Sequence, residues 1–258
     1  MLLKRIKVSG LLSFGPTGID LPLHPLNVFI GANGSGKSNL LEVLGLLRAA
    51  PKSLPAPIKA MGGVREWLWK GTPVPDGGVV EAFVEYPGGF VGFADLHHVL
   101  ALRQHGTRFE VATELIEDDA SEPRLWHFRW SGGHPELRDV DRNERRLKPN
   151  QVAPEESILS QLKDPERYPA LSMLQGAYAN IRLYRNWSFG PAAALRLEQS
   201  THGRNDFLED GGENLAVVLS QIRSKVRTEL LHSLKKLYAG IEGWDFAISA
   251  GNVQLFLE

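Results

Sequence analysis

Residues 31–38, Gly-Ala-Asn-Gly-Ser-Gly-Lys-Ser, combine the residue types that hold a chain of phosphates, and the octet fits the P-loop pattern G-x-x-x-x-G-K-[ST]. Gly34 and Gly36 have no Cβ, so successive backbone N–H groups can turn inward around a phosphate. Lys37 would bring its ammonium to the β- and γ-phosphates, and Ser38 would offer its hydroxyl to Mg²⁺. The spacing therefore predicts a site for a nucleoside triphosphate.

The residues on both sides of the octet favour the same interpretation. Asn27–Ile30, "NVFI", predicts a short buried strand. Leu40, Leu44 and Leu47 follow at helical spacing, so we expect a helix that begins inside the octet and points its N-terminal dipole at the phosphates. Pro51 should end it. A glycine-rich turn between two core elements is the alternative, and the order strand, octet, helix disfavours it.

Bulk composition narrows the class of protein. The chain has 258 residues, a formal charge of −1 and no cysteine, which excludes disulfides and thiolate metal sites. Met1–Leu3 run directly into Lys4, Arg5 and Lys7, so we expect no signal peptide, no membrane partner and a cytoplasmic location. With no overall basic field, any nucleic-acid binding must rest on a local patch or on a partner.

Three segments follow from the pattern along the chain. Residues 1–60 should hold two N-terminal strands, the P-loop strand and its helix, and residues 61–150 should form an antiparallel β subdomain, because short alternating runs are separated by glycine-rich turns. Residues 151–258 should hold helical stretches on either side of a break at Asp164-Pro165, a strand over 180–185, one long amphipathic helix from Glu213 to Tyr238, and a hairpin turned at 250–252.

Residues 2–44, with Asn39 directly after the octet, resemble the opening of the ABC-type ATPase heads of SMC and RecF proteins and of the bacterial stand-alone AAA-family ATPases of that branch. The stretches "GGVREWLWKG", "LYRNWSFG" and "EDGGENLAVVL" resemble the stand-alone ATPases specifically. The resemblance covers nearly the whole chain. It implies an α/β P-loop NTPase fold, namely the N-terminal lobe of an ABC-type head with an antiparallel β-meander insertion.

The resemblance also implies roles for individual residues. ATP and Mg²⁺ are the expected cofactors, with Ser13 and Phe14 near the base or ribose. Gln161 is the candidate Q-loop glutamine, which would reach Mg²⁺ and the attacking water; a solvated glutamine on a helix face is the alternative. Lys37 and Gln161 are thus the predicted catalytic residues, Ser38 and Gln161 the predicted metal contacts, and the nucleotide contacts are Ser13, Phe14, Gly31, Asn33, Gly34, Ser35, Gly36, Lys37, Ser38 and Asn39.

Hydrolysis in such heads also needs a Walker B Asp-Glu after an apolar run, an LSxG-type signature from a second subunit and a switch histidine. Glu114 interrupts the run before Glu117–Asp119, and Gln254 interrupts the run before Glu258. Ser131–His134 imitates the signature but predicts a hairpin turn. We therefore expect an N-terminal half-head, inactive alone, from a truncated chain, a split protein or a degenerate subunit.

Two functional hypotheses remain open. In the first, the protein is an ATPase whose heads dimerise with a second copy around two Mg-ATP and hydrolyse them, in DNA repair or phage defence. In the second, it is a nucleotide-gated binding module that holds or releases a nuclease-type effector or DNA. A P-loop kinase or GTPase is disfavoured, because no N-K-x-D tetrapeptide occurs.

Two other groups of residues have ordinary explanations. The scattered histidines 97, 98, 105 and 134 lack carboxylates at ligand spacing, so solvated or core positions are favoured over a metal site. The basic run from Arg138 to Lys148 has four acids in or beside it, which favours a solvated charged loop over a phosphate-binding surface.

Overall fold

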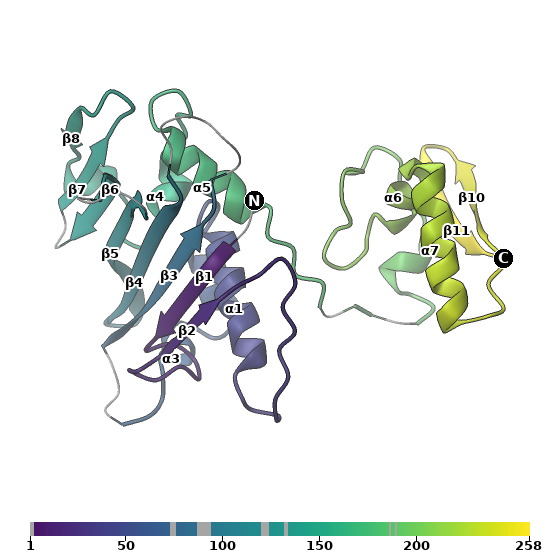
Figure 1. Cartoon of the computed structure of the whole chain (residues 1–258), viewed down its shortest axis with the longest axis horizontal. Coiled ribbons are helices and arrows are strands. Elements are labelled where there is room, and N and C mark those ends of the chain that lie inside the picture. The colour runs from purple at the N-terminus through teal and green to yellow at the C-terminus, as the bar shows by residue number, and fades with distance from the viewer. Residues whose placement is uncertain are drawn as a thin grey trace. The chain divides into compact units, whose positions relative to one another are not determined.

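The computed structural model of the chain describes residues 3–72, 76–86, 94–119, 124–131, 134–185, 187–188 and 190–258 (Figure 1). At 131 and 149 it describes the backbone alone. The chain divides into two compact units, Met1–Ile181 and Arg182–Glu258. This division differs from the three predicted segments, since the first unit joins the first two segments and part of the third.

An eight-stranded antiparallel sheet dominates the first unit, in the order β2-β1-β3-β4-β5-β6-β7-β8. The two N-terminal strands and the β-meander are as predicted, and they form one continuous sheet. The expected strand near residues 90–96 lies mostly outside the described residues. The strand bounds are β1 Leu3–Ser9, β2 Ile19–Pro22, β3 Gly77–Val84, β4 Leu96–His105, β5 Arg108–Asp118, β6 Trp126–Ser131, β7 His134–Arg138 and β8 Glu144–Arg146.

The strands β6 and β7 pair with Ser131 opposite His134. This is the pairing expected of a hairpin, so the stretch that imitates a signature motif connects two neighbouring strands of the sheet. Gly132 and Gly133 lie outside the described residues.

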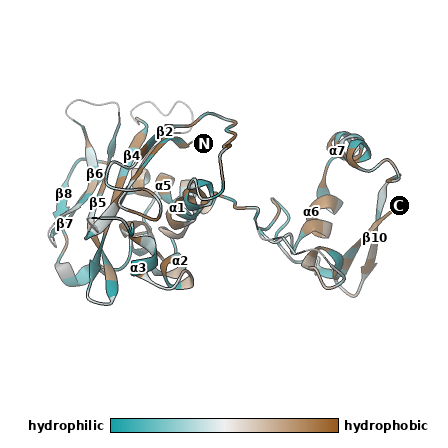
Figure 2. Ribbon diagram, turned by 90° about the horizontal axis from the view of Figure 1, so that it is seen from below, coloured by the Kyte–Doolittle hydropathy of each residue, from teal (hydrophilic) through white to brown (hydrophobic). Residues whose placement is uncertain are grey.

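Helices of the first unit share one core with alternate residues of the sheet. Ile6 and Val8 of β1 and Val80 and Ala82 of β3 are buried in the same cluster as Leu46 of α1. Figure 2 shows the apolar sides of α1 and α5. Because successive side chains of a strand alternate between faces, burying one face leaves the other for polar residues. The helix bounds are α1 Lys37–Ala49, α2 Pro55–Ala60, α3 Val64–Trp67, η1 Pro149–Gln151, α4 Ile158–Gln161 and α5 Pro169–Ala179.

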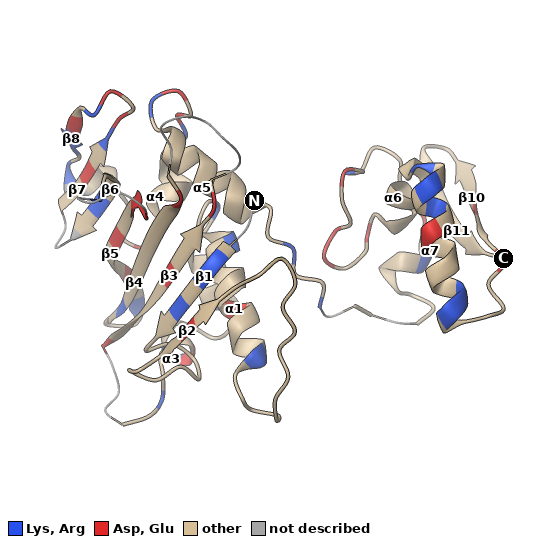
Figure 3. Cartoon of the chain, viewed as in Figure 1, with Lys and Arg blue, Asp and Glu red and all other residues tan. Residues whose placement is uncertain are grey.

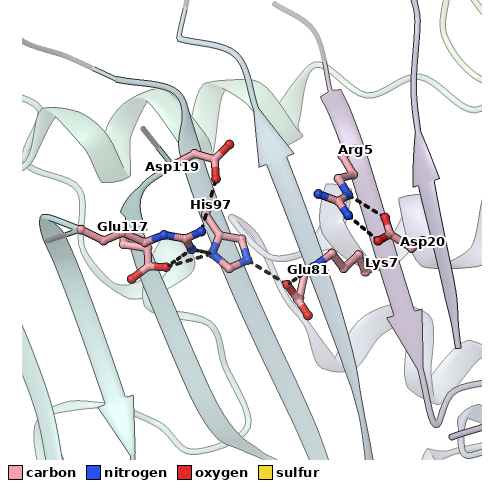
Figure 4. A network of polar contacts seen from close by, with 8 residues as sticks. Arg5, Lys7, Asp20, Glu81, His97, Glu117 and Asp119 are labelled. Atoms are coloured by element: carbon pink, nitrogen blue, oxygen red, sulfur yellow. Dashed lines mark hydrogen bonds and ion pairs between the residues drawn. The ribbon is translucent and has the colours of Figure 1, made fainter. Parts of the chain in front are cut away.

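The other face of the sheet carries a polar network that crosses several strands (Figure 4). Arg5 of β1 donates to Asp20 of β2 at 2.6 Å. His97 of β4 lies between Glu81 and Glu117, with 3.0 Å from a ring nitrogen to each carboxylate. The imidazole also stacks on Phe83, with ring centroids 4.4 Å apart. The His97 ring thus bridges carboxylates of the two neighbouring strands.

The predicted buried strand over residues 27–30 is wrong. No strand is assigned there, and Val28 is 74% exposed and Ile30 92% exposed. A four-residue apolar segment is held as a buried strand only by neighbours that accept its backbone hydrogen bonds. Among the described residues none pairs with it, although its sequence suits a buried strand.

The second unit is a small α/β arrangement with a three-stranded antiparallel sheet in the order β10-β11-β9. The predicted C-terminal hairpin is confirmed. Ala250 and Gly251 both have positive φ, 47° and 84°, which fits a two-residue turn of the type that closes hairpins. The bounds are η2 Ala194–Arg196, β9 Gln199–Ser200, α6 Leu215–Gln221, α7 Ser224–Leu237, β10 Trp244–Ser249 and β11 Asn252–Leu257.

Two expectations for this part of the chain are corrected. Residues 180–185 form no strand; their alternating pattern suits one, but no strand pairs with them in the described part of the chain. The long helix is two helices, because Ile222 has extended backbone dihedrals of −69° and 143°. The helical spacing of apolar residues continues across this break. The spacing therefore does not reveal that the two residues between α6 and α7 are extended.

Candidate phosphate-binding site

The predicted phosphate loop leads into α1, and the helix begins inside the octet as expected. Gly36 caps α1 with φ 92° and ψ 2°, and Gly34 has φ 81°. Residues with a Cβ rarely adopt this left-handed backbone, so the loop needs glycine at both positions. The first intrahelical bond runs from the Leu40 N–H to the Gly36 carbonyl at 3.0 Å. The earlier N–H groups of α1 therefore have no helical acceptor and suit an anion.

Lys37 turns its side chain back over the loop. Its ammonium donates to the carbonyls of Gly31 at 2.7 Å and Ala32 at 2.8 Å, and to the Ser35 hydroxyl at 3.3 Å. The Ser35 N–H in turn donates to the Ala32 carbonyl at 3.2 Å. These bonds hold a positive charge beside the exposed backbone of the loop, where a phosphate oxygen could replace the weakest of the three acceptors.

Ser13 and Phe14 lie directly against this loop. A Cβ added to Gly36 would stand 2.7 Å from the Ser13 Oγ and 3.3 Å from Phe14 Cε1. Phe14 is buried in the core of the unit, and the turn that carries both is tied to α3 by the Leu12 N–H, which donates to the Trp67 carbonyl at 2.7 Å. Leu12 has a positive φ of 52°. A residue with a side chain keeps this strained conformation only where its packing and hydrogen bonds fix the backbone. The fold thus fixes Ser13 beside the phosphate loop.

The remaining predicted nucleotide contacts are accessible. Asn33, Gly34, Ser35 and Ser38 are exposed or half-buried, and Asn39 lies in the first turn of α1. A Cβ at Gly34 would meet nothing within 4 Å, whereas one at Gly31 would come within 2.9 Å of the Ser35 Oγ. The loop is therefore open on the side of Gly34, where a ligand has room.

Gln161 uses its side chain within its own part of the chain. Its Oε1 accepts from the Ala153 N–H at 2.6 Å, and its Nε2 donates to the carbonyls of Glu156 at 3.1 Å and Ser157 at 3.3 Å. These bonds close the loop that leads into α4. The role of Gln161 at a metal stays a prediction, and in the structure the amide stabilises this loop.

The acids that follow the two interrupted apolar runs are engaged elsewhere. Glu117 accepts from Arg124 at 2.6 Å, and Asp118 contacts a ring nitrogen of His127 at 2.7 Å. Glu258 lies in the second unit, at the end of the hairpin, where its backbone carbonyl accepts from the Glu242 N–H at 2.7 Å. None of these contacts involves the phosphate loop.

A buried polar network, which the sequence pattern did not predict, joins the sheet to α4 and α5. Glu114 of β5 is fully buried and accepts from the Ser157 hydroxyl and, at 2.9 Å, from the Ile158 N–H. Its other partner is His98, 3.3 Å away, and His98 lies 2.8 Å from the Tyr178 hydroxyl. Burial, and then the nearby Glu114 charge, raise the pKa of Tyr178 well above its usual value. The available signal was Glu114 itself, an acid within an apolar strand.

The comparison with protein families decides the family. The model described as "AAA domain, putative AbiEii toxin, Type IV TA system" matches residues 26–215, which is most of the chain and includes the whole phosphate loop. The chain belongs to this family. The resemblance to AAA-family ATPases predicted from the sequence is thereby confirmed, as is the predicted α/β P-loop fold with a large antiparallel β region. This AAA domain is of the ATPase type.

Other comparisons add little to the AAA assignment. No curated protein matches the chain. A solved structure from work on the structural biochemistry of ATP-driven dimerization and DNA stimulated activation of SMC ATPases is similar over 91% of this chain and 99% of that chain, with 14% identity and a TM-score of 0.38. Within the described residues of the AAA domain, no helix has the length and apolar character needed to cross a membrane.

Proposed function

We propose that this AAA domain binds Mg-ATP at residues 31–39 and serves an ATPase whose heads dimerise around two nucleotides and hydrolyse them to ADP and phosphate. The observation that carries the proposal is the loop itself. Two left-handed glycines, a folded-back lysine and the free N-terminus of a 13-residue helix converge there. Each feature suits an anion, and their combination is the pattern of a loop that holds a polyphosphate.

Each residue of the loop has a role in this proposal. Lys37 would neutralise charge on the β- and γ-phosphates, and Ser38 would coordinate Mg²⁺. Ser13, which lies against Gly36, is placed to contact the bound nucleotide, with Phe14 packed behind it. Because Gln161 is tied to residues 153–157, its proposed contact with Mg²⁺ would require that loop to open.

The proposed base that activates water is neither Glu117 nor Asp118. These acids are paired with Arg124 and His127 within the sheet, which supports a base supplied from elsewhere, such as another polypeptide or another part of the assembly. A second copy of the chain is the proposed partner for closing each nucleotide site.

The proposed setting is a cytoplasmic DNA repair or phage-defence system, with DNA as a second partner. The family description, which refers to a toxin of a type IV TA system, supports defence over repair. A second candidate function is a nucleotide-gated module that regulates an effector such as a nuclease with little hydrolysis of its own. The contacts of Glu117 with Arg124 and of Asp118 with His127 also suit that alternative, since neither acid is free to act as a base.

Turnover and association of the protein, measured together, separate the two functions. The steady-state rate of Mg-ATP hydrolysis would be measured, and the mass of the protein in solution would be measured by light scattering with and without Mg-ATP. Lys37→Ala is the control for both. The ATPase proposal predicts an ATP-dependent dimer and turnover, both lost in Lys37→Ala. An ATP-dependent association without turnover would favour the gated module, and neither effect in the wild-type protein would contradict both functions.

A further inference from the structure

A cavity in the first unit is lined by residues at the start of α5 and beside the ends of β6 and β7. These three elements are labelled in Figure 1. The cavity has a volume of about 200 Å³. Leu125, Pro169 and Leu171 form apolar walls, and His127, Arg138 and Arg142 bring polar groups. No residue of the phosphate loop lines it. Its size suits a small ligand, since drug-sized ligands occupy larger pockets.

The first turn of α5 offers buried donors to this cavity. The first intrahelical bond runs from the Ser172 N–H to the Tyr168 carbonyl at 3.1 Å, and no side chain caps the helix. Among the described residues, the N–H groups of Ala170 and Leu171 therefore have no acceptor, although these residues are only 2% and 1% exposed. A helix N-terminus buried without partners calls for an acceptor from elsewhere.

Tyr168 adds a second, independent donor. It lines the cavity and is 4% exposed, and its hydroxyl is buried without a hydrogen-bond partner in the described part of the chain. The guanidinium of Arg167 lies 5.9 Å from the centre of its ring. An unsatisfied buried hydroxyl costs free energy, and a ligand oxygen would remove that cost.

Most charged side chains around the cavity already have partners of opposite charge or hydrogen-bond partners. Figure 3 shows the acidic and basic residues along this part of the chain. Arg138 pairs with Glu144 at 2.6 Å, and His127 pairs with Asp118. Asp139 also lines the cavity, and its carboxylate accepts from the Asn143 N–H at 2.8 Å and pairs with Arg167 at 3.4 Å. Within the described residues no ion pair involves Arg142.

The backbone at Arg142 forms a tight turn, and its side chain is exposed at the edge of the cavity. Its φ of 66° is positive, and its N–H donates to the Asp139 carbonyl at 3.0 Å. The tight turn from Asp139 to Asn143 thus places Arg142 at the cavity. Arg142 has no ion pair among the described residues, so its guanidinium could form two parallel hydrogen bonds to an oxyanion.

We propose that this cavity binds a small organic anion whose phosphate or carboxylate group is held by the first turn of α5, the Tyr168 hydroxyl and Arg142. All three are donors without acceptors in the described part of the chain, so the missing partner is an oxyanion. The organic part would lie against Leu125, Pro169 and Leu171. This site is separate from the phosphate loop and independent of the proposed ATPase function.

Calorimetric titration of the full-length chain tests the proposal, with phenyl phosphate and benzoate as probes of the two anionic groups. The Lys37→Ala background removes binding at the phosphate loop. We expect one equivalent of at least one probe to bind in that background, and Arg142→Ala and Tyr168→Phe each to weaken it by about tenfold or more, as expected for hydrogen bonds to a charged group. Arg145→Ala, on β8 and outside the cavity, should leave binding unchanged.

Thermal unfolding without ligand adds a second readout that does not depend on the choice of probe. Tyr168→Phe removes only a hydroxyl without a partner, so the melting temperature should stay the same or rise. A clear fall would show that the hydroxyl already has a partner and would overturn the proposal. Absence of binding by both probes, or equal binding by Arg142→Ala and Arg145→Ala, would also overturn it.

Discussion

Gly36 shows most clearly how one residue shapes the phosphate loop. It needs a positive φ of 92°, and its missing side chain leaves the space in which the Ser13 hydroxyl lies. Gly34 needs a similar φ of 81° but faces open space. A side chain at Gly34 would therefore cause backbone strain alone, whereas one at Gly36 would cause both backbone strain and a steric clash.

We expect Gly36→Ala to weaken Mg-ATP binding more than Gly34→Ala does, because only the former brings a Cβ to 2.7 Å from the Ser13 Oγ. Fluorescence titration with a labelled ATP analogue would measure both. In the Ser13→Gly background, which lacks that hydroxyl, adding Gly36→Ala should cost less affinity than it does in the wild type. Equal losses for the two glycine variants would show that the contact with Ser13 has no influence on the loop.

Gln161 presents a choice between a structural and a metal-binding role. Its amide closes the 153–157 loop through four hydrogen bonds. If that is its role, Gln161→Ala should lower the free energy of unfolding by about 1–3 kcal/mol and leave the Mg²⁺ dependence of ATP binding unchanged. Urea unfolding and ATP titrations at several Mg²⁺ concentrations would measure both. A changed Mg²⁺ dependence at unchanged stability would instead support the metal role.

At the scale of elements, the buried network around Glu114 fastens the start of α4 to the sheet. We expect Glu114→Ala to destabilise the chain by about 3–5 kcal/mol, because it leaves His98, Ser157 and the Ile158 N–H buried without their acceptor. Denaturant unfolding gives the value. Glu110→Ala on the same strand breaks a pair with the exposed Arg103 and should cost about 1 kcal/mol or less. Similar losses in the two variants would mean that the network contributes little.

The turn that carries Arg142 predicts a pH dependence. Burial alone would raise the pKa of Asp139, but hydrogen bonds from Asn143 and Arg167 outweigh it and hold the pKa below its usual value of 3.8. Since a lowered pKa stabilises the folded state above the usual value, this contribution is lost as the pH falls below 3.8. The difference in melting temperature between wild type and Asp139→Asn should be constant from neutral pH down to that value and shrink below it.

The matched control for this measurement is Asp141→Asn, an exposed neighbour in the same turn. Its melting temperature should follow that of the wild type at every pH. If the Asp139→Asn difference kept its size under acid conditions, Asp139 would not be ionised and bonded in the folded chain as described.

At the scale of the whole molecule, the sequence predicts what depends on local spacing. The octet, the helix that follows it, the β-meander and the hairpin at residues 250–252 each have a signal within a few residues, and the structure contains all four. The segment 27–30 has the same kind of signal, but a strand also needs neighbours, which no local pattern reveals. The extended Ile222 between α6 and α7 has no signal in the spacing either.

Parts of the site could be predicted only through a resemblance or not at all. Ser13 and Gly36 are far apart in the sequence, and only the fold shows that they touch. The cavity at α5 could not be predicted from the sequence at all. The Tyr168 hydroxyl has no partner in the described part of the chain, and such a donor is recognised only once the other polar contacts are known. A pattern of residue types indicates which secondary structure a segment can form. Which polar groups lack a hydrogen-bond partner depends on how the whole chain packs.

Binding of Mg-ATP to the intact chain tests the central claim most directly, by calorimetry on the wild type, Lys37→Ala and Lys52→Ala, whose lysine is exposed and outside the loop. We predict one ATP per chain, binding weakened by at least about tenfold in Lys37→Ala, and unchanged binding in Lys52→Ala. If the wild type bound no ATP, or if Lys37→Ala bound it as tightly as the wild type, residues 31–38 would not be the nucleotide site.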